Sequence, residues 1–283
     1  MITGKTVNLG VIGWPIAHSL SPVMQNAAIV AAGIDYNYTA LPVAPEKLGA
    51  AVNGLRALNY RGFNVTIPHK GTVMPLLDEI DKAAQVIGAV NTVVNENGRL
   101  VGYNTDCLGF MGALLSRGIA IQDKIAVLLG AGGAARAVIW GLLQAGVREV
   151  VLGVRNPKKA QALVADFTPY GTVTVCHWEQ ADFAVKLGEC AMLVNTTPLG
   201  MTPNVDACPS VDWSKVNQAA FVYDIIYTPA ETRFLREARS HGHEAVNGEE
   251  MLAGQGAEAL RLWTGIEPDI SKMQEALRAA LAR

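Results

Sequence analysis

Several features of membrane, secreted and nucleic-acid-binding proteins are missing from this chain of 283 residues. No stretch approaches the roughly 18 uninterrupted apolar residues that a membrane helix needs, and the amino terminus lacks a signal-peptide pattern. Lysine and arginine total 23 against 25 acidic residues, so the net charge of −2 gives no general attraction to nucleic acid or anionic membranes. We therefore expect a cytoplasmic protein with no nucleic-acid or membrane partner.

Cysteine is also scarce. The four cysteines, Cys107, Cys176, Cys190 and Cys208, stand singly, with no Cys-x-x-Cys pair and no histidine at the spacing of a metal site. This pattern predicts free thiols in a reducing compartment and no bound metal. Half of the chain is hydrophobic and only 17% is charged, which excludes a disordered or fibrous protein.

Strand and helix patterns alternate along the chain, which favours an α/β fold with parallel sheets covered on both faces. In a first block, the expected strands are residues 7–12, 36–43, 62–67 and the hairpin arms 89–95 and 99–103. In a second block, they are residues 124–129, 147–154, 172–177, 191–195 and 220–225. Helical patterns lie between the strands and fill most of residues 248–283.

A glycine-rich turn follows the first strand of the second block. Gly130–Ala135 has the pattern Gly-x-Gly-x-x-Ala and opens a helix. Glycines allow a sharp turn and a close approach to a pyrophosphate, which the free amides of the helix N-terminus then bind. The turn is typical of a dinucleotide-binding Rossmann domain, and its expected cofactor residues are Gly130, Ala131, Gly132, Gly133 and Ala134.

The turn after the next strand bears on the choice between NAD and NADP. NAD-binding proteins usually carry Asp or Glu there to hold the ribose hydroxyls. Residues 153–159 contain no acid but contain Arg155, Lys158 and Lys159. Because cationic side chains suit the 2′-phosphate of NADP, we predict NADP as the cofactor, with NAD as a weaker alternative. Arg155 is expected to carry most of this preference.

Polar side chains gather where the strands of the first block end. They are Ser19, Ser21, Asn64, Thr66, Lys70, Asn91 and Asp106. Hydroxyls and amides match a sugar-like polyol, and a lysine beside a carboxylate can transfer a proton. Ser21 and Asp106 are also explained as caps at the start of a helix. His69 is a rival acid–base group, ranked second because neighbouring side chains in an extended segment point in opposite directions.

Eight segments of the chain carry a family resemblance. They are Gly13–Pro22, Phe63–Lys70, Ile87–Thr92, Gly102–Asp106, Gly130–Arg136, Asn195–Met201, Tyr223–Pro229 and Asn247–Leu260. With these motifs in this order, the chain resembles shikimate dehydrogenase over nearly its whole length. The resemblance implies a discontinuous substrate-binding α/β domain, residues 1–106 and 249–283, and an inserted NADP-binding Rossmann domain, residues 107–248.

The resemblance also implies roles for single residues. Lys70 and Asp106 match the catalytic pair. The implied substrate-binding residues are Ser19, Ser21, Asn64, Thr66, Asn91, Tyr227 and Gln255. The implied cofactor residues, besides the glycine turn, are Arg155, Lys159, Thr196, Gly248 and Met251, the last of which also suits an apolar core.

Three positions depart from the family pattern. Cys107 stands beside Asp106 where glycine is usual. Val154 and Asn156 flank Arg155 where asparagine and threonine are usual, so Arg155 carries over without its familiar neighbours.

The implied activity is that of an oxidoreductase of chorismate and aromatic amino acid biosynthesis, which interconverts shikimate and 3-dehydroshikimate by hydride transfer with NADP. Lys70, oriented by Asp106, is the expected proton donor or acceptor for the reacting oxygen. Two alternatives stay open: a quinate/shikimate dehydrogenase with relaxed use of NAD and NADP, and a non-catalytic protein that senses the metabolite. The intact pair argues against the sensor. A monomer or homodimer is expected.

Overall fold

The computed structural model describes residues 2–282, which divide into two compact units. Unit 1 consists of Met1–Gly109 and Ala253–Arg283, and unit 2 of Phe110–Leu252. The chain passes between the units within helix α4 (Asp106–Ser116) and again within helix α9 (Glu249–Thr264). The domain limits expected from the sequence lie at or just before the first residues of these helices, and the domain assignment stays a prediction.

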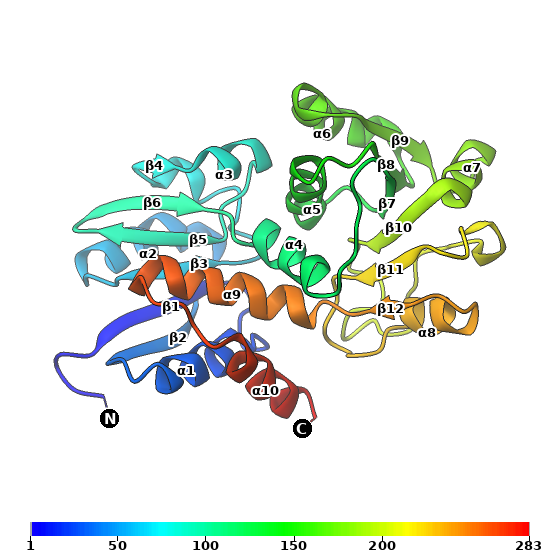
Figure 1. Cartoon of the computed structure of the whole chain (residues 1–283). Helices are drawn as coiled ribbons and strands as arrows, with labels where there is room; N and C mark the ends of the chain where they lie inside the picture. The colour runs from blue at the N-terminus through cyan, green and yellow to red at the C-terminus, as the bar shows by residue number, and fades with distance from the viewer. Residues whose placement is uncertain (1, 283) are drawn as a thin grey trace. The chain divides into compact units, whose positions relative to one another are not determined.

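Unit 1 contains a mixed six-stranded sheet within the described residues (Figure 1). Parallel pairing joins the first three strands of the sheet, and antiparallel pairing joins the third, fourth and fifth. In order across the sheet, the strands are β2 (Tyr36–Pro42), β1 (Val7–Gly13), β3 (Gly62–Val65), β5 (Thr92–Glu96), β6 (Arg99–Tyr103) and β4 (Glu79–Ile80).

The predicted hairpin is present as β5 and β6, joined by Asn97 and Gly98. Both linking residues have positive φ angles, 56° and 95°, as a two-residue turn of type I′ requires. Asparagine and glycine adopt this left-handed backbone more readily than other residues do. A local sequence signal therefore sets the register of the two strands.

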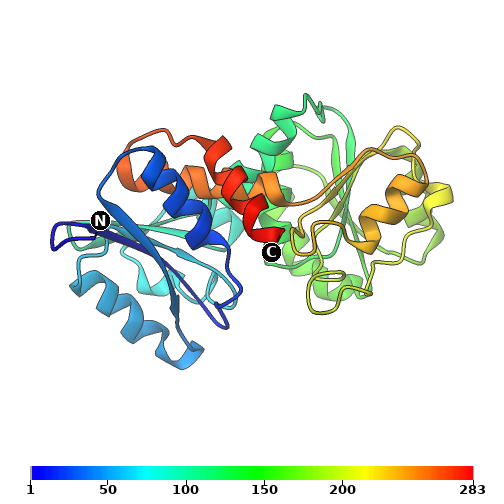
Figure 2. The same ribbon diagram turned by 90° about the horizontal axis from the view of Figure 1, so that it is seen from below.

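Helices from both ends of the chain cover the sheet of unit 1. Figures 1 and 2 both show α1 and α10 side by side, so the carboxy-terminal segment packs against the first helix of the protein. Besides α9, the helices and 3₁₀ turns of the unit are α1 (Ser21–Ala31), η1 (Pro45–Lys47), α2 (Leu48–Ala57), η2 (Met74–Leu76), α3 (Lys82–Ile87) and α10 (Ile270–Leu281).

Trp263 anchors α9 on the sheet of unit 1. Its side chain is 1% exposed, and its indole Nε1 donates a hydrogen bond to the carbonyl oxygen of Val93 at 2.9 Å. Its ring centroid lies 6.0 Å from that of Tyr38 on β2. Residue 62 on β3 has to be glycine, because a Cβ there would overlap the indole nitrogen.

Unit 2 contains a parallel six-stranded sheet within the described residues. In order, its strands are β9 (Val173–His177), β8 (Glu149–Val154), β7 (Ile125–Leu129), β10 (Cys190–Asn195), β11 (Phe221–Asp224) and β12 (Ala245–Val246). Counted from β7, this order is 3-2-1-4-5-6, that of a Rossmann domain. The order reverses between β7 and β10, so a ligand is expected at the carboxyl ends of these strands.

The helices and 3₁₀ turns of unit 2 connect successive parallel strands. They are α5 (Gly133–Gln144), α6 (Pro157–Phe167), η3 (Thr168–Tyr170), α7 (Ala181–Glu189), η4 (Trp213–Lys215) and α8 (Arg233–Ser240). The predicted α/β class, with a Rossmann unit inserted in a second α/β unit, is confirmed. Among residues 2–282, no helix is both long and apolar enough to cross a membrane.

The surroundings of Gly62 and Gly54 predict opposite effects on stability when each is changed to alanine. Gly62→Ala should lower the free energy of unfolding by about 1–3 kcal/mol, because the added methyl group forces the indole out of place. Gly54→Ala, in α2 with no atom within 4 Å of the new Cβ, should raise it by up to about 1 kcal/mol. Urea unfolding of both variants measures the difference, and equal midpoints for Gly62→Ala and wild type would contradict the packing.

Candidate active site

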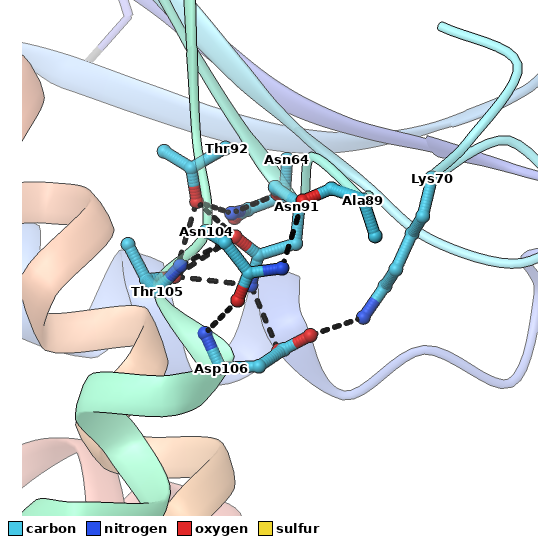
Figure 3. Close-up of polar contacts among 8 residues, drawn as sticks. All are labelled: Asn64, Lys70, Ala89, Asn91, Thr92, Asn104, Thr105 and Asp106. Carbon is cyan, nitrogen blue, oxygen red and sulfur yellow. Dashed lines mark hydrogen bonds and ion pairs between the residues drawn. The ribbon is translucent and has the colours of Figure 1, made fainter. Parts of the chain in front are cut away.

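Lys70 and Asp106 form an ion pair in unit 1. Nζ of Lys70 lies 2.6 Å from Oδ2 of Asp106, and the two side chains are 27% and 12% exposed (Figure 3). Lys70 follows β3, whereas Asp106 is the first residue of α4. The pair is therefore partly shielded from water, and more than a quarter of the Lys70 side-chain surface stays exposed.

Asn91 fixes the orientation of the carboxylate. Its Nδ2 donates to Oδ1 of Asp106 at 2.8 Å, while Lys70 bonds to Oδ2. Its own Oδ1 accepts a hydrogen bond from the backbone N–H of Thr105 at 2.8 Å. The N–H of Asp106 donates to Oδ1 of Asn104 at 3.1 Å. Both oxygens of the carboxylate are therefore held by named partners (Figure 3).

Asn64 is buried on β3 and belongs to the same network. Its Nδ2 donates to the carbonyl oxygen of Asn91 and to Oγ1 of Thr92, both at 3.0 Å. Its Oδ1 accepts a hydrogen bond from the hydroxyl of Tyr38 at 2.6 Å. Both amide protons are thus engaged by the protein, and the remaining capacity of Asn64 toward a ligand is one lone pair on Oδ1.

The expected capping role of Ser21 is wrong. Ser21 is the first residue of α1, and Leu20 precedes it as an N-cap without a side-chain hydrogen bond. Ser19 lies just before the helix, and its Oγ accepts a hydrogen bond from the N–H of Ser21 at 3.3 Å. Burial raises the pKa of the Tyr38 hydroxyl, and the neighbouring Ser21 side chain lowers it in part. The Tyr38 hydroxyl itself donates to Asn64.

His69 is buried against the core of unit 1. Its side chain is 1% exposed, and Nε2 lies 2.7 Å from the carbonyl oxygen of Val43. Such an enclosed ring cannot reach a substrate, which favours Lys70 as the proton-transfer group. Thr66 lies half-buried just after β3, and its N–H donates to the carbonyl oxygen of Ile12 at 3.0 Å.

The glycine turn of unit 2 has the geometry of a phosphate site. Gly130 follows β7 with φ at 103°, a conformation that favours glycine, and a Cβ there would lie 2.8 Å from Cγ2 of Thr197. Gly132 is the N-cap of α5, and no side chain caps this helix. Apart from the adjoining backbone, no atom lies within 4 Å of a Cβ built at Gly132 or Gly133. An open backbone at a helix N-terminus fits the pyrophosphate of a dinucleotide.

Arg155 lies exposed at the start of the turn after β8. Its Cζ is 6.0 Å from the ring centroid of Trp178, a distance at which the guanidinium is attracted to the ring face. Asn156 caps α6 by accepting a hydrogen bond from the N–H of Lys159 at 3.3 Å, which gives this departure from the family pattern a structural role. With no acid in residues 153–159, the turn fits the 2′-phosphate of NADP.

Family models match three parts of the chain. They are the shikimate dehydrogenase substrate binding domain over residues 11–93, the coenzyme F420-dependent NADP oxidoreductase over residues 124–207, and the shikimate 5′-dehydrogenase C-terminal domain over residues 248–278. The shikimate dehydrogenase (NADP(+)) of Carboxydothermus hydrogenoformans is 44% identical over 276 residues, which cover 98% of each chain. The chain belongs to the shikimate dehydrogenase family.

The fold of this chain matches solved structures of the family over nearly its full length. A shikimate dehydrogenase in complex with NADP+ matches with a TM-score of 0.92 at 40% identity, covering 100% of this chain and 98% of the other. The enzyme of Thermus thermophilus in complex with NADP(H) and shikimate matches with a TM-score of 0.88 at 39% identity, covering 98% and 100%. The predicted family and fold are therefore confirmed.

Two residues expected near the cofactor in this family hold backbone together in unit 2. The hydroxyl of Thr196 donates to the carbonyl oxygen of Leu129 at 2.8 Å, which ties the segment after β10 to the end of β7. Gly248 packs directly on Ile225, because a Cβ at position 248 would overlap the carbonyl oxygen of Ile225. Both residues therefore lie at the carboxyl edge of the Rossmann sheet, and their contacts with cofactor stay a prediction.

The remaining family positions are divided between the units. Tyr227 and Met251 belong to unit 2, and Met251 is buried as an apolar core residue would be. Gln255 lies buried on the part of α9 that belongs to unit 1. Cys107 is buried beside Asp106, and burial, followed by the charge of Asp106, raises the pKa of its thiol to about 12. The thiol is therefore neutral and unreactive at physiological pH.

Unit 2 contains a buried carboxylate that no motif in the sequence analysis singled out. Asp224, the last residue of β11, is fully buried. Its Oδ1 accepts hydrogen bonds from Nδ2 of Asn195 and the N–H of Ile226, both at 3.1 Å, and its Oδ2 accepts from Oγ1 of Thr232 at 2.6 Å. Burial raises the pKa of Asp224 to about 6, and these hydrogen bonds limit the rise.

The raised pKa predicts how stability depends on pH. Between pH 3.8 and about 6 the folded protein holds a proton on Asp224 that the unfolded chain has released, so stability falls as the pH rises through this range. The loss amounts to about 3 kcal/mol at about 1.4 kcal/mol per pKa unit. Asp224→Asn removes this titration. The melting temperature of Asp224→Asn minus that of wild type should therefore increase from pH 4.5 to pH 7.5. A difference that stays constant over this range would contradict the raised pKa of Asp224.

Proposed function

We propose that this protein is an NADP-dependent shikimate dehydrogenase, which interconverts shikimate and 3-dehydroshikimate. The observation that carries the proposal is the Lys70–Asp106 ion pair, oriented by Asn91 and set among hydroxyl and amide groups. A chain that also has the Gly130 turn and Arg155 combines a proton-transfer pair with a site for a phosphorylated dinucleotide. Membership of the shikimate dehydrogenase family supports the same activity.

The polar groups of unit 1 suit the substrate. Hydroxyls and amides form hydrogen bonds with the ring hydroxyls and the carboxylate of a polyol acid, and Lys70 adds a positive charge. The proposed substrate-binding residues are Ser19, Ser21, Asn64, Thr66, Asn91, Tyr227 and Gln255. The proposed domains are residues 1–106 with 249–283 for substrate and residues 107–248 for cofactor.

The chemistry of the reaction is divided between cofactor and protein. A bound NADP would supply the hydride acceptor for oxidation of the shikimate alcohol, and NADPH the hydride donor for reduction of the ketone. Lys70 Nζ transfers the proton. During reduction it donates this proton to the oxygen on which negative charge develops, and during oxidation it accepts the hydroxyl proton as a neutral amine. Asp106 orients the amine and is itself held by Asn91.

The cofactor is held by unit 2. The open glycine turn, from Gly130 to Ala134, is proposed to bind the pyrophosphate at the N-terminus of α5. Arg155, with Lys159 nearby, is proposed to bind the 2′-phosphate, and Thr196, Gly248 and Met251 are the further proposed cofactor residues. Four free cysteines agree with a reducing compartment, so the cytoplasm is the proposed location, and a monomer or homodimer is the proposed assembly.

Replacing the lysine of the pair tests the proposed function. Lys70→Ala should lower kcat for shikimate oxidation by about 10²- to 10⁴-fold, because a positioned acid–base group is lost. The exposed Lys82→Ala of the same unit is the control and should keep wild-type kcat. Steady-state rates of NADPH formation, with circular dichroism to verify folding, give the comparison. A folded Lys70→Ala variant with near-normal kcat would remove Lys70 from the reaction.

Replacing Arg155 tests the cofactor assignment. Arg155→Ala should raise the KM for NADP about tenfold, since one charge-assisted hydrogen bond to the phosphate is lost, and leave the KM for NAD nearly unchanged. Arg148→Ala, at the opposite end of β8, is the matched control and should alter neither value. If Arg155→Ala changes both cofactors equally, the turn after β8 is not the phosphate site.

A further inference from the structure

Asn195 and Asp224 form a buried polar pair at the carboxyl edge of the Rossmann sheet. They are the last residues of β10 and β11 and lie directly opposite each other in the parallel register. Both side chains are fully buried, and Nδ2 of Asn195 donates to Oδ1 of Asp224 at 3.1 Å. The pair lies at the edge of the sheet where a Rossmann domain binds its ligand.

Asp224 fixes both ends of one loop, residues 225–232, called here the β11 loop. The N–H of Ile226 at its start donates to Oδ1, and Oγ1 of Thr232 at its end donates to Oδ2. Thr232 is also the N-cap of α8, so the carboxylate connects the loop to that helix. Tyr227, the proposed substrate ligand, comes directly after Ile226.

Asn195 fixes a second loop, residues 196–202, called here the β10 loop. Its Oδ1 accepts from the N–H and the hydroxyl of Thr197, at 3.0 and 2.7 Å. Thr196, the proposed cofactor ligand, lies between the two residues. The N–H of Thr202 donates to the carbonyl oxygen of Thr228 at 3.0 Å, so the β10 and β11 loops are also bonded to each other.

Burying the Asp224 carboxylate in this way contributes little net free energy to the stability of the fold. The partners of the Asp224 carboxylate named above are neutral donors, and burying a charged group without an opposite charge costs more than burying an amide or an apolar side chain. The carboxylate provides two acceptor oxygens at one point. They bind the start of the β11 loop at Ile226, its end at Thr232, and the last residue of the neighbouring strand β10, Asn195. The hydrogen bonds of the carboxylate are thus made to the β11 loop and to the residue that starts the β10 loop.

We propose that Asp224 is a positioning residue, which acts through Asn195 and the two loops to present Tyr227 to the substrate and Thr196 to the cofactor. The proposal rests on the proposed function, because both loop residues take their roles from it. Asp224 itself touches neither substrate nor cofactor. Its removal is therefore expected to change the reacting half of the site and to spare the adenine half, which Arg155 and the glycine turn hold.

Two substitutions at this position separate hydrogen-bond geometry from charge. Asp224→Ala should lower kcat/KM for shikimate about 10- to 100-fold, the cost of misplacing groups by about an ångström. Asp224→Asn should retain most of kcat/KM, because its oxygen can accept from Ile226 and its amide can donate to Oγ1 of Thr232. The dissociation constant of adenosine 2′,5′-bisphosphate, measured by calorimetry, should stay unchanged in both variants.

A matched control and a coupled variant exclude a merely structural effect. Glu149→Gln removes a comparable acid from the amino end of β8, where it accepts from Thr174 and Lys186, both at 2.7 Å. It should lower the melting temperature without changing kcat/KM. In a Tyr227→Phe background, Asp224→Ala should cost less than it does in wild type, because both changes act on the same group.

The outcomes are distinct from those that test the proposed function. If wild type does not oxidise shikimate with NADP, the proposed function fails. If wild type is active and Asp224→Ala keeps its kcat/KM, or loses activity additively with Tyr227→Phe, the positioning role is overturned while the function stands. An Asp224→Asn variant as impaired as Asp224→Ala also overturns it, since charge rather than geometry would then be required.

Discussion

The ion pair between Lys70 and Asp106 is the interaction on which the rest of the site depends. A partly exposed pair of this kind contributes about 1 kcal/mol or less to stability, so its value is chemical rather than structural. It has a defined geometry only because Asn91 holds the second oxygen of the carboxylate and Thr105 holds Asn91. The hairpin and α4 therefore serve to place one carboxylate against one amine.

The two units solve different physical problems. Unit 1 gathers amides and hydroxyls whose hydrogen bonds are mostly used within the protein, which makes the surroundings of Lys70 rigid. Unit 2 leaves backbone open at the glycine turn, where α5 has no side-chain cap and the pyrophosphate is proposed to bind. The polar side chains around Lys70 are thus held in place by the protein, whereas the backbone N–H groups of the glycine turn are left without protein side-chain partners.

Local signals in the sequence were sufficient for much of the fold. The Asn97–Gly98 turn, the glycines of residues 130–133 and the Rossmann alternation each depend on neighbours in the chain, and the structure has them. The family resemblance extended the prediction to the Lys70–Asp106 pair, which the structure brings within hydrogen-bonding distance.

Contacts between distant residues could not be read from the sequence. Tyr38 bonds to Asn64 across 26 positions, and Asn195 to Asp224 across 29. Strand periodicity shows which face such a residue takes but not its partner. The capping of α1 was mistaken because the backbone starts the helix one residue earlier than the serine pattern suggests: Ser21 is already helical, and Leu20 stands at the N-cap.

A panel of kcat/KM values for shikimate and quinate, each with NADP and with NAD, tests the assignment most directly. Absorbance of the reduced nicotinamide follows each reaction. The highest value is expected for shikimate with NADP, because Arg155 is the proposed ligand of the extra phosphate and the polar groups of unit 1 are the proposed partners of the shikimate hydroxyls. Preference for quinate or for NAD would point to a relaxed quinate/shikimate dehydrogenase, and no reduction of either cofactor with either acid would contradict an enzymatic role for Lys70 and Asp106.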